Sequence, residues 1–495
     1  MFKVIFFLVL LGFIVRVLFV FQGGVSFHYD MARDAFEAKQ IWQEHHLKIL
    51  GPPTSTPGLY HGVLYYYLIA PFYGLGNGDP RVVAIFLSLL NSLTIIPITL
   101  LVKDLFKSPK WVILSGLLFA LSFEATQYGA WISNPAPAVL TVALFFYFLR
   151  AWQIGKTYGL YLATLMAAAS TQFQFFLIYL FLLIPIFGYI FKIKTDLKER
   201  GVSFLIAVLG LINFFITAVK FKAFGSMFLG FFNISTSGFI DFRPQFAELF
   251  LNYLNKFTEL FTYNFFPTNV ILGGLLSFLV LYSIRKERLL LFYLFSNLPI
   301  FIFGGHSNTY ANIGLVTPAI LGTIVLFKNM ARLGKPLSLL IVSLIIASNL
   351  YAIFKYSPLG QVILVIPNDM ILKNELKVID ETYKLAENKP FSINTLTLPL
   401  WTNTTWAYLY SWYGKNKYGY VPVFLGHDQI GLLGVDSLKR IEKPLEKTFF
   451  IIEPHEGIPD DRFQWEIGSE NSKTDLIKEV KYEGLILQSR KPKSL

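Results

Sequence analysis

Long apolar runs are the feature of this 495-residue sequence that most constrains its fold. A helix needs about 20 apolar residues to cross the hydrocarbon core of a bilayer. Hydrophobic residues make up 54% of the chain and charged residues only 15%, whereas soluble domains carry roughly 25% charged residues. The sequence therefore predicts an all-α polytopic membrane protein with about eleven transmembrane helices. The runs lie near residues 3–22, 81–102, 111–130, 136–150, 158–171, 174–191, 202–220, 267–284, 289–304, 312–327 and 336–354.

A shorter apolar segment, "GVLYYYLIAPFYGLGNG" at residues 62–78, decides the orientation of the chain. Its apolar part has about a dozen residues, a length typical of interfacial or re-entrant segments, and it contains Pro71. If it does not cross, every second connection from residue 103 onward is basic, and the connections 131–138 and 304–312 contain no Lys or Arg. Because Lys and Arg collect in cytoplasmic loops, we expect residues 62–78 not to cross and the N-terminus to be cytoplasmic.

This orientation places three sizeable segments outside the cytoplasm, namely the loops 23–80 and 221–266 and the tail from residue 356. The tail combines a helical pattern at 369–387 with strand-like runs at 391–396, 448–453 and 484–489. We therefore expect a transmembrane domain over residues 1–355 and a small extracytoplasmic α/β domain over residues 356–495.

The stretch "FHYDMARDAF", residues 27–36, places charges directly after the first apolar run. On a helix, Asp30, Asp34 and Glu37 share one face, because they recur at i, i+4 and i+7. The pattern predicts an amphipathic helix on the membrane surface. The Pro-rich loop 51–62 is expected to cover Asp30. The alternative is that Asp30 is only a helix N-cap and the other charges form a solvated face.

The order of an apolar anchor, an acidic helix, a Pro-rich loop, "LYHGVLYYYLIAPF" and a series of spans resembles the GT-C fold glycosyltransferases. The likeness is to the protein O-mannosyltransferase and lipid A aminoarabinose transferase group, and it covers roughly the first 330 residues by layout. It implies transfer of a sugar from a polyprenyl-phosphate carrier to an acceptor on the non-cytoplasmic face.

The resemblance also implies residue roles on the acidic helix. Asp30 matches the catalytic aspartate of the first external loop, although Met31 follows it where the family usually has Glu. One positioned carboxylate suffices to take a proton from an acceptor hydroxyl. Arg33 can stabilise charge on the departing phosphate, or it can form a plain ion pair with Asp34 or Glu37. We count Arg33 and Asp34 as substrate-binding residues.

The resemblance places further substrate contacts in other external loops. His61 matches a basic residue that contacts the lipid phosphate, and an ordinary histidine is charged part of the time near neutral pH. Asn134 stands where related enzymes often carry an aspartate, and its amide can hydrogen-bond sugar hydroxyls. His306 and Tyr310 precede a proline-bearing span and become candidates for carrier or acceptor contacts.

Other chemistry-bearing residues admit two interpretations each. Arg16, inside the first run, either binds the carrier headgroup or snorkels or pairs with another helix. Glu124, near the outer end of a span, is a candidate for the same cavity as Asp30. The aromatic stretch 401–420 can stack acceptor sugars, but such clusters are more often a core or a membrane contact.

The sequence predicts an inverting glycosyltransferase that uses a polyprenyl-phosphate sugar, with Asp30 as the general base. Its partners are that carrier, an acceptor protein, lipid or glycan, and membrane lipids, with no nucleic acid, because the net charge of +12 is first an orientation signal. No metal-ligand set is defined, and a divalent cation stays an open alternative. A transporter or flippase of lipid-linked glycans is the main rival, and a membrane-anchored binding protein is the third alternative.

Overall fold

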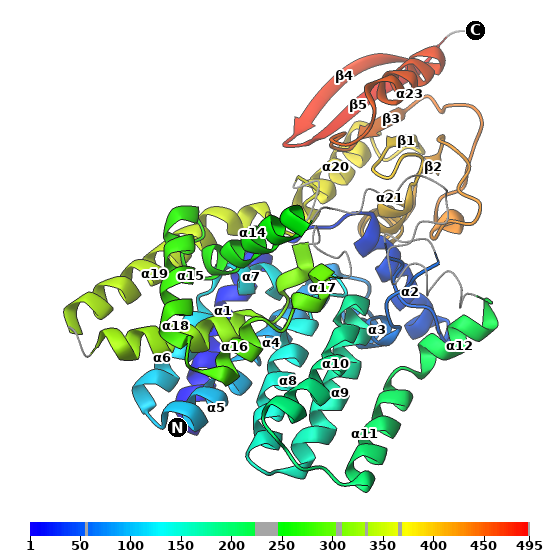
Figure 1. Ribbon diagram of the computed structural model, residues 1–495. Helices are drawn as coiled ribbons and strands as arrows, with labels where there is room; N and C mark the ends of the chain where they lie inside the picture. The colour runs from blue at the N-terminus through cyan, green and yellow to red at the C-terminus, as the bar shows by residue number, and fades with distance from the viewer. Residues whose placement is uncertain (55–57, 223–245, 303–308, 332–334, 365–368, 494–495) are drawn as a thin grey trace.

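The computed structural model shows a helical bundle with an α/β region at one end (Figure 1). It describes residues 1–54, 58–222, 246–302, 309–331, 335–364 and 369–493.

The helical part follows the predicted apolar runs, each of which contains helix. In chain order its elements are α1 (Phe2–Phe21), α2 (Tyr29–Gln43), α3 (Leu64–Leu75), α4 (Pro80–Ser92), α5 (Ile95–Phe106), α6 (Pro109–Ala120), α7 (Phe123–Gly129), α8 (Ala138–Gln153), α9 (Thr157–Phe173), η1 (Phe175–Tyr179), α10 (Leu180–Ile190), α11 (Leu197–Gly210), α12 (Ile212–Lys220), α14 (Phe246–Phe265), α15 (Val270–Ile284), α16 (Arg288–Leu294), α17 (Leu298–Ile302), η3 (Thr309–Asn312), α18 (Val316–Met330), α19 (Lys335–Tyr356) and η4 (Ser357–Leu359).

The number of uninterrupted membrane spans is smaller than the number of apolar runs. Within the described residues, three helices are long and apolar enough to cross a membrane by length and composition: Phe2–Phe21, Pro80–Phe106 and Pro336–Leu359. Three bent pairs raise this number to as many as six. The predicted number of about eleven is therefore not confirmed, because several runs fold as shorter or broken helices. The bent pairs are α6 with α7 at 57°, α11 with α12 at 49°, and α14 with α15 at 104°.

Arg16 explains how α1 is fixed inside the bundle. Its side chain is fully buried, and its Nε donates to Asn91 Oδ1 at 2.6 Å. Its two terminal nitrogens donate to the Phe119 and Ala120 carbonyls at the C-terminal end of α6. No further helical turn follows these carbonyls, although the Phe119 carbonyl also accepts from the Ser122 N–H at 3.2 Å, so the guanidinium helps to cap α6. The structure thus bears out helix-to-helix pairing for Arg16, and the headgroup-binding interpretation was wrong.

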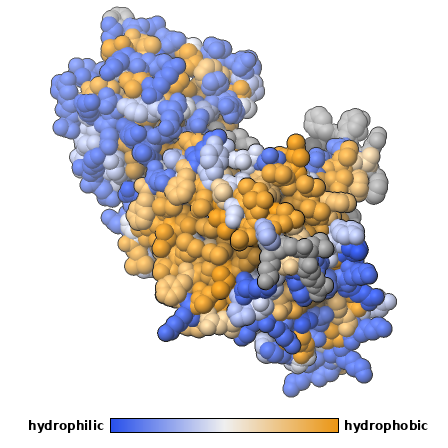
Figure 2. Space-filling model, turned by 90° about the vertical axis from the view of Figure 1, so that its left-hand side faces the viewer, coloured by the Kyte–Doolittle hydropathy of each residue, from blue (hydrophilic) through white to orange (hydrophobic). Residues whose placement is uncertain are grey.

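The outer surface of the bundle is largely apolar. Figure 2 shows a broad hydrophobic band that separates the hydrophilic α/β region from a second hydrophilic end. Fully exposed large apolar side chains on soluble proteins rarely form a patch of this extent, so the band is the surface expected to contact lipid.

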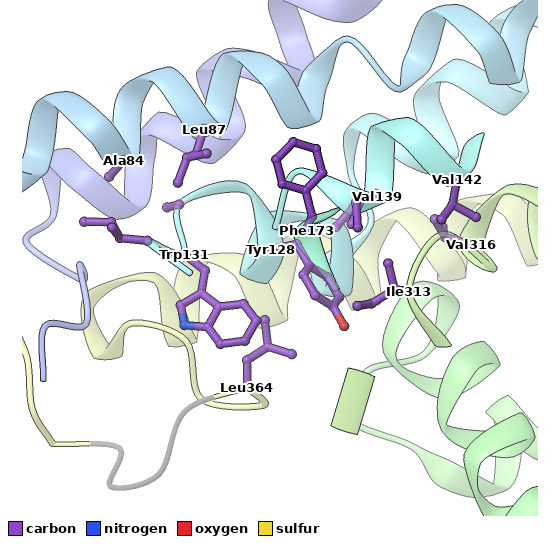
Figure 3. Packing of buried hydrophobic residues seen from close by; sticks show 14 of the residues in the cluster. Ala84, Leu87, Tyr128, Trp131, Val139, Val142, Phe173, Ile313, Val316 and Leu364 are labelled. Carbon is purple, nitrogen blue, oxygen red and sulfur yellow. The ribbon is translucent and has the colours of Figure 1, made fainter. Parts of the chain in front are cut away.

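The interior of the bundle is a close-packed apolar cluster around the break between α7 and α8. Trp131 and Tyr128 lie there with Phe173, Val139 and Ile313 (Figure 3). All five are almost fully buried. This cluster fixes the neighbouring ends of α7, α9 and α18 relative to one another.

The C-terminal α/β region, residues 369–493, contains one five-stranded sheet in the order β2-β1-β3-β5-β4. The predicted helix and the three predicted strands are present as α20, β1, β3 and β5, whereas β2 and β4 were not predicted. Strand β1 is parallel to β2 and β3, and β5 is antiparallel to β3 and β4. The elements are α20 (Leu372–Leu385), β1 (Ser392–Leu396), α21 (Thr404–Leu409), η5 (Tyr410–Gly414), α22 (Lys415–Tyr418), β2 (Val423–Phe424), η6 (Val435–Ser437), β3 (Thr448–Ile452), α23 (Asp460–Lys473), β4 (Thr474–Tyr482) and β5 (Leu485–Pro492).

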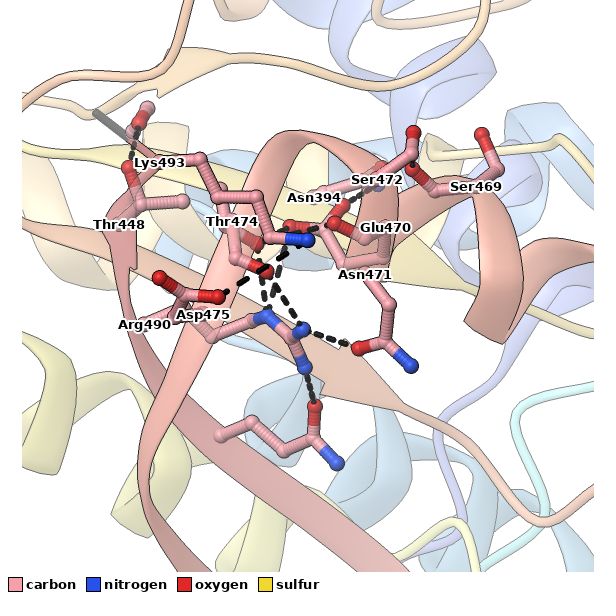
Figure 4. A network of polar contacts seen from close by, with 12 residues as sticks. Asn394, Thr448, Ser469, Glu470, Asn471, Ser472, Thr474, Asp475, Arg490 and Lys493 are labelled. Atoms are coloured by element: carbon pink, nitrogen blue, oxygen red, sulfur yellow. Dashed lines mark hydrogen bonds and ion pairs between the residues drawn. The ribbon is translucent and has the colours of Figure 1, made fainter. Parts of the chain in front are cut away.

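A buried arginine ties the sheet to its last helix (Figure 4). Arg490 of β5 donates to Thr474 Oγ1 at 2.7 Å and lies 3.7 Å from Glu470 Oε1 of α23. Thr474 in turn donates to the same Glu470 carboxylate at 2.7 Å. The network satisfies the charges that burial would otherwise destabilise.

The aromatic stretch 401–420 belongs to the packed interior. Trp406 and Tyr410 are fully buried, and the Trp406 indole donates to Glu453 Oε1 at 2.9 Å. Tyr408 packs edge-on against Phe36 of α2, with ring centroids 5.2 Å apart. The core interpretation is confirmed for these residues, and they attach the α/β region to α2.

Two predicted external segments contain helices. The loop 23–80 folds into α2 and α3, which lie between the bundle and the α/β region (Figure 1). The loop 221–266 contains α14, and its residues 223–245 lie outside the described part of the chain. At 12 residues, α3 spans about 18 Å, which is too short for the hydrocarbon core and agrees with an interfacial segment.

Candidate functional site

The acidic helix α2 begins with His28 as its N-cap. The Asp30 N–H donates to His28 Nδ1 at 3.4 Å, and the His28 N–H donates to the Met31 sulfur at 3.4 Å. Asp30 therefore lies inside the first turn, where its negative charge is favourable beside the unpaired backbone N–H groups. The alternative in which Asp30 serves only as the N-cap was wrong, because His28 holds that position.

Arg33 joins two carboxylates on one face of α2. Its Nη1 donates to Asp30 Oδ1 at 2.6 Å. Its Nε and Nη2 donate to Asp34 Oδ1 at 2.9 and 2.7 Å. The structure thus realises the ion pair with Asp34 that was the alternative for Arg33. A guanidinium has five N–H donors; three serve these two carboxylates, and the Tyr66 phenol takes a further hydrogen bond from Arg33.

The two carboxylates differ in exposure. The Asp30 side chain is 54% exposed, whereas that of Asp34 is 2% exposed. The expectation that Asp30 is covered was wrong, because the helix packs its Asp34 side against α3. Asp30 Oδ2 accepts no hydrogen bond from any residue in the described ranges, so this oxygen is open to an incoming group.

Burial sets the protonation of Asp34. It raises the pKa of the Asp34 carboxyl to about 7, while the Arg33 guanidinium pulls in the opposite direction. The same pair of carboxylates raises the pKa of Arg33 beyond any accessible range. Arg33 is therefore always charged, and Asp34 is the carboxyl of this site that titrates near neutral pH.

Helix α3 supplies the wall opposite α2. Tyr65 and Tyr66 are buried at 0% and 2% exposure, and the Tyr66 phenol lies beside the Arg33 guanidinium. The Tyr65 hydroxyl has no hydrogen-bond partner among the described residues. A buried hydroxyl without a partner is unfavourable, and an acceptor that reached it would satisfy this donor. Sequence reasoning missed both tyrosines, although the run "LYYYL" begins three residues after His61.

His61 and Asn134 meet at the break between α9 and η1. The Phe175 N–H donates to His61 Nδ1 at 3.1 Å. The Asn134 side-chain amide donates to the Phe173 carbonyl at 2.6 Å and to Gln174 Oε1 at 3.1 Å. Both side chains therefore support a backbone break, and Gln174 joins them without having been predicted.

His61 is neutral in this environment. Burial lowers its pKa to about 3, and the nearby Arg33 charge acts in the same direction. The accepting Nδ1 leaves the proton on Nε2, which makes the ring a donor there. The expectation that His61 is charged part of the time was wrong, because only 8% of the residue is exposed.

The remaining predicted contacts lie elsewhere. The Tyr310 ring packs on Trp131, with centroids 5.5 Å apart, beside the central apolar cluster. His306 lies outside the described residues. Glu37, which shares the acidic face, pairs with Lys48 at 2.7 Å.

Glu124 belongs to a separate polar cluster between α7 and α14. It accepts a hydrogen bond from Asn264, whose Oδ1 accepts from Ser122 Oγ at 2.6 Å. These contacts join helices and give no link to Asp30. Over the residues that the structure describes, no group of three His, Asp or Glu side chains could hold a metal ion.

Comparison with solved structures identifies the architecture. Two crystal structures of ArnT from Cupriavidus metallidurans align with 98% of this chain. The structure bound to undecaprenyl phosphate gives a TM-score of 0.56 at 8% identity and is covered over 98% of its length. The apo structure gives 0.55 at 10% identity and is covered over 97%. The chain has the ArnT fold.

The ArnT likeness confirms the expected GT-C architecture and extends it beyond the first 330 residues, because the alignment includes nearly all of the α/β region. Identities of this size establish the fold and leave the activity to the site. No protein-family model matches the sequence, and no curated protein matches it.

Proposed function

We propose that this protein is a membrane glycosyltransferase that moves a sugar from a polyprenyl phosphate to an acceptor hydroxyl, with inversion at the anomeric carbon. The observation that carries the proposal is the open Asp30 oxygen on α2, held by Arg33 in a chain with the ArnT fold. The solved relative is bound to undecaprenyl phosphate, which supports a carrier of the same class here.

The chemistry assigns Asp30 the role of general base. The acceptor oxygen attacks the anomeric carbon, the bond to the carrier phosphate breaks, and the acceptor proton passes to Asp30 Oδ2. The phosphate leaves with its negative charge and needs little protonation. Arg33 holds Asp30 in place through Oδ1, which leaves Oδ2 directed to the acceptor.

Neutral donors and one fixed cation are available for the carrier phosphate. Arg33 supplies the fixed positive charge, His61 carries its proton on Nε2, and the Tyr65 hydroxyl has no partner among the described residues. Asp34 positions Arg33 by two hydrogen bonds. Asn134, His306 and Tyr310 stay proposed contacts of the carrier or acceptor. The acceptor is a protein, a lipid or a glycan.

Asp30→Asn tests the catalytic role. The amide keeps an oxygen that can accept from Arg33 but removes basicity, so transfer should fall by roughly 10² to 10⁴. The measurement is transfer from a labelled polyprenyl-phosphate sugar by purified protein in detergent. Glu37→Gln is the matched control, because it removes a carboxylate from the same face and should retain activity. An Asp30→Asn protein as active as the parent would remove Asp30 from the mechanism.

We also propose that the N-terminus is cytoplasmic and that α2, α3 and the α/β region lie outside. The chain has no cysteine, so single cysteines can be introduced without background. Cysteines at the exposed positions Lys107 and Lys194 should be protected from an impermeant maleimide in intact cells. Cysteines at the exposed positions Asn77 and Lys439 should react, and the reverse pattern would invert the topology.

A further inference from the structure

A cavity of about 200 Å³ lies between α2, the turn from α3 to α4, and the α21–α22 segment. Its α2 residues include Ala35, Lys39 and Trp42. Lys39 is nine residues after Asp30, which is about 2.5 helical turns. The cavity is therefore on the face of α2 opposite Asp30, and it is separate from the proposed reaction site.

Two glycines shape the walls of this cavity. A Cβ on Gly74 would lie 2.1 Å from the Trp42 indole, and a Cβ on Gly78 would lie 2.8 Å from the Trp412 indole. Each tryptophan therefore packs directly on backbone where only glycine fits. The Tyr408 hydroxyl donates to the Gly78 carbonyl at 2.7 Å, which fixes the α/β region against this turn.

The cavity carries uncompensated positive charge. Lys39 and Lys415 line it, and no Asp or Glu does. Neither lysine forms a salt bridge with any residue of the described ranges. Side-chain amides of Asn77 and Asn416 complete the polar lining. The lining thus carries two positive charges, which favour an anion in the cavity.

We propose that this cavity binds an anionic sugar unit, a pyranose that carries a phosphate group. Indole faces pack on the apolar face of a sugar ring, amides hydrogen-bond its hydroxyls, and lysines bind the phosphate as point charges. A volume of about 200 Å³ is below the roughly 300–1,000 Å³ of drug-sized sites, so the cavity suits one sugar unit. The proposal does not depend on Asp30 or on transferase activity.

Calorimetric titration of the purified full chain with three probes tests the ligand class. Glucose 6-phosphate should bind, and glucose and inorganic phosphate should each bind at least about tenfold more weakly, because each lacks one half of the recognised group. Binding of inorganic phosphate as tight as that of glucose 6-phosphate would overturn the sugar assignment. Absence of glucose 6-phosphate binding would overturn the site.

Variants locate the binding. Lys39→Gln and Lys415→Gln should each weaken glucose 6-phosphate binding roughly three- to tenfold, and Trp412→Leu should weaken both the phosphorylated and the neutral sugar. Lys439→Gln and Trp465→Leu are the matched controls, since both residues are exposed and neither lines the cavity. Equal losses in the control and cavity variants would contradict the assignment. A Trp412 variant with a lowered melting temperature is set aside, and the two lysine variants then decide.

Discussion

The two faces of helix α2 differ in whether their charges are paired. On the face that carries Asp30 and Asp34, Arg33 is shared between the exposed Asp30 and the buried Asp34. On the opposite face, Lys39 lines an open cavity together with Lys415 and has no salt-bridge partner among the described residues. The charges on one face are balanced by neighbouring side chains, and the positive charge on the other face is not.

The difference separates the roles that we propose for the two faces, which are chemistry on one and binding on the other. Pairing of opposite charges holds these side chains in place, because movement of Arg33 away from Asp34 would leave a buried carboxylate without a partner. A fixed carboxylate with one open oxygen suits proton transfer. An uncompensated cationic cavity instead gains stability only when an anion arrives.

The largest expected effect follows loss of the shared arginine. Arg33→Met leaves Asp34 buried without its cation, and breaking a buried pair in this way costs about 3–5 kcal/mol. Lys39→Gln on the opposite face should change stability by less than about 0.5 kcal/mol. Thermal unfolding in detergent measures both variants.

A double variant separates charge from packing. If the cost arises from the unpaired carboxylate, Arg33→Met combined with Asp34→Leu should recover much of the lost stability. Equal melting temperatures for Arg33→Met and Lys39→Gln would remove the asserted difference between the faces.

A smaller effect concerns pH. The folded pKa of Asp34, about 7, lies above its ordinary value of 3.8, so the native state binds the extra proton more tightly than the unfolded state. The resulting stability is complete below about pH 4 and is lost as pH rises through 7. The melting temperature of the parent should therefore decline over this window more steeply than that of Asp34→Asn. Parallel profiles would show that Asp34 does not titrate there.

The smallest effect is expected at Glu37. Its pair with Lys48 is partly exposed, with side chains 19% and 21% exposed, and such pairs contribute about 0–1 kcal/mol. Glu37→Gln should lower stability by no more than that and should change transfer less than about threefold. A loss of transfer as large as that of Asp30→Asn would move the base along the helix.

The sequence predicted the elements better than their breaks. Hydropathy placed α1 within one residue at either end, because a continuous apolar run needs no tertiary information. The bend between α6 and α7 was not predictable in this way. Arg16, more than 100 residues away in the chain, donates hydrogen bonds to the carbonyls at that break. A local sequence pattern cannot predict such a long-range contact.

The candidate site was predictable in the same partial sense. Helical spacing placed Asp30 and Asp34 on one face, but spacing does not give depth, and only the packing of α3 makes Asp34 the buried member. His61 was expected, from its residue type, to be charged part of the time near neutral pH. Its neutral state arises from burial at the α9–η1 break, which adjacent sequence does not reveal.

The central claim is most directly tested by release of lipid phosphate from a labelled polyprenyl-phosphate sugar by the purified protein. A panel of such carriers should contain at least one from which the parent releases lipid phosphate while the sugar appears on an acceptor with inverted anomeric configuration. With the same carrier, Asp30→Asn should release lipid phosphate at least roughly 10²-fold more slowly than the parent. Lipid phosphate release that is equal in the parent and in Asp30→Asn, or absent with every carrier and acceptor, would contradict the account.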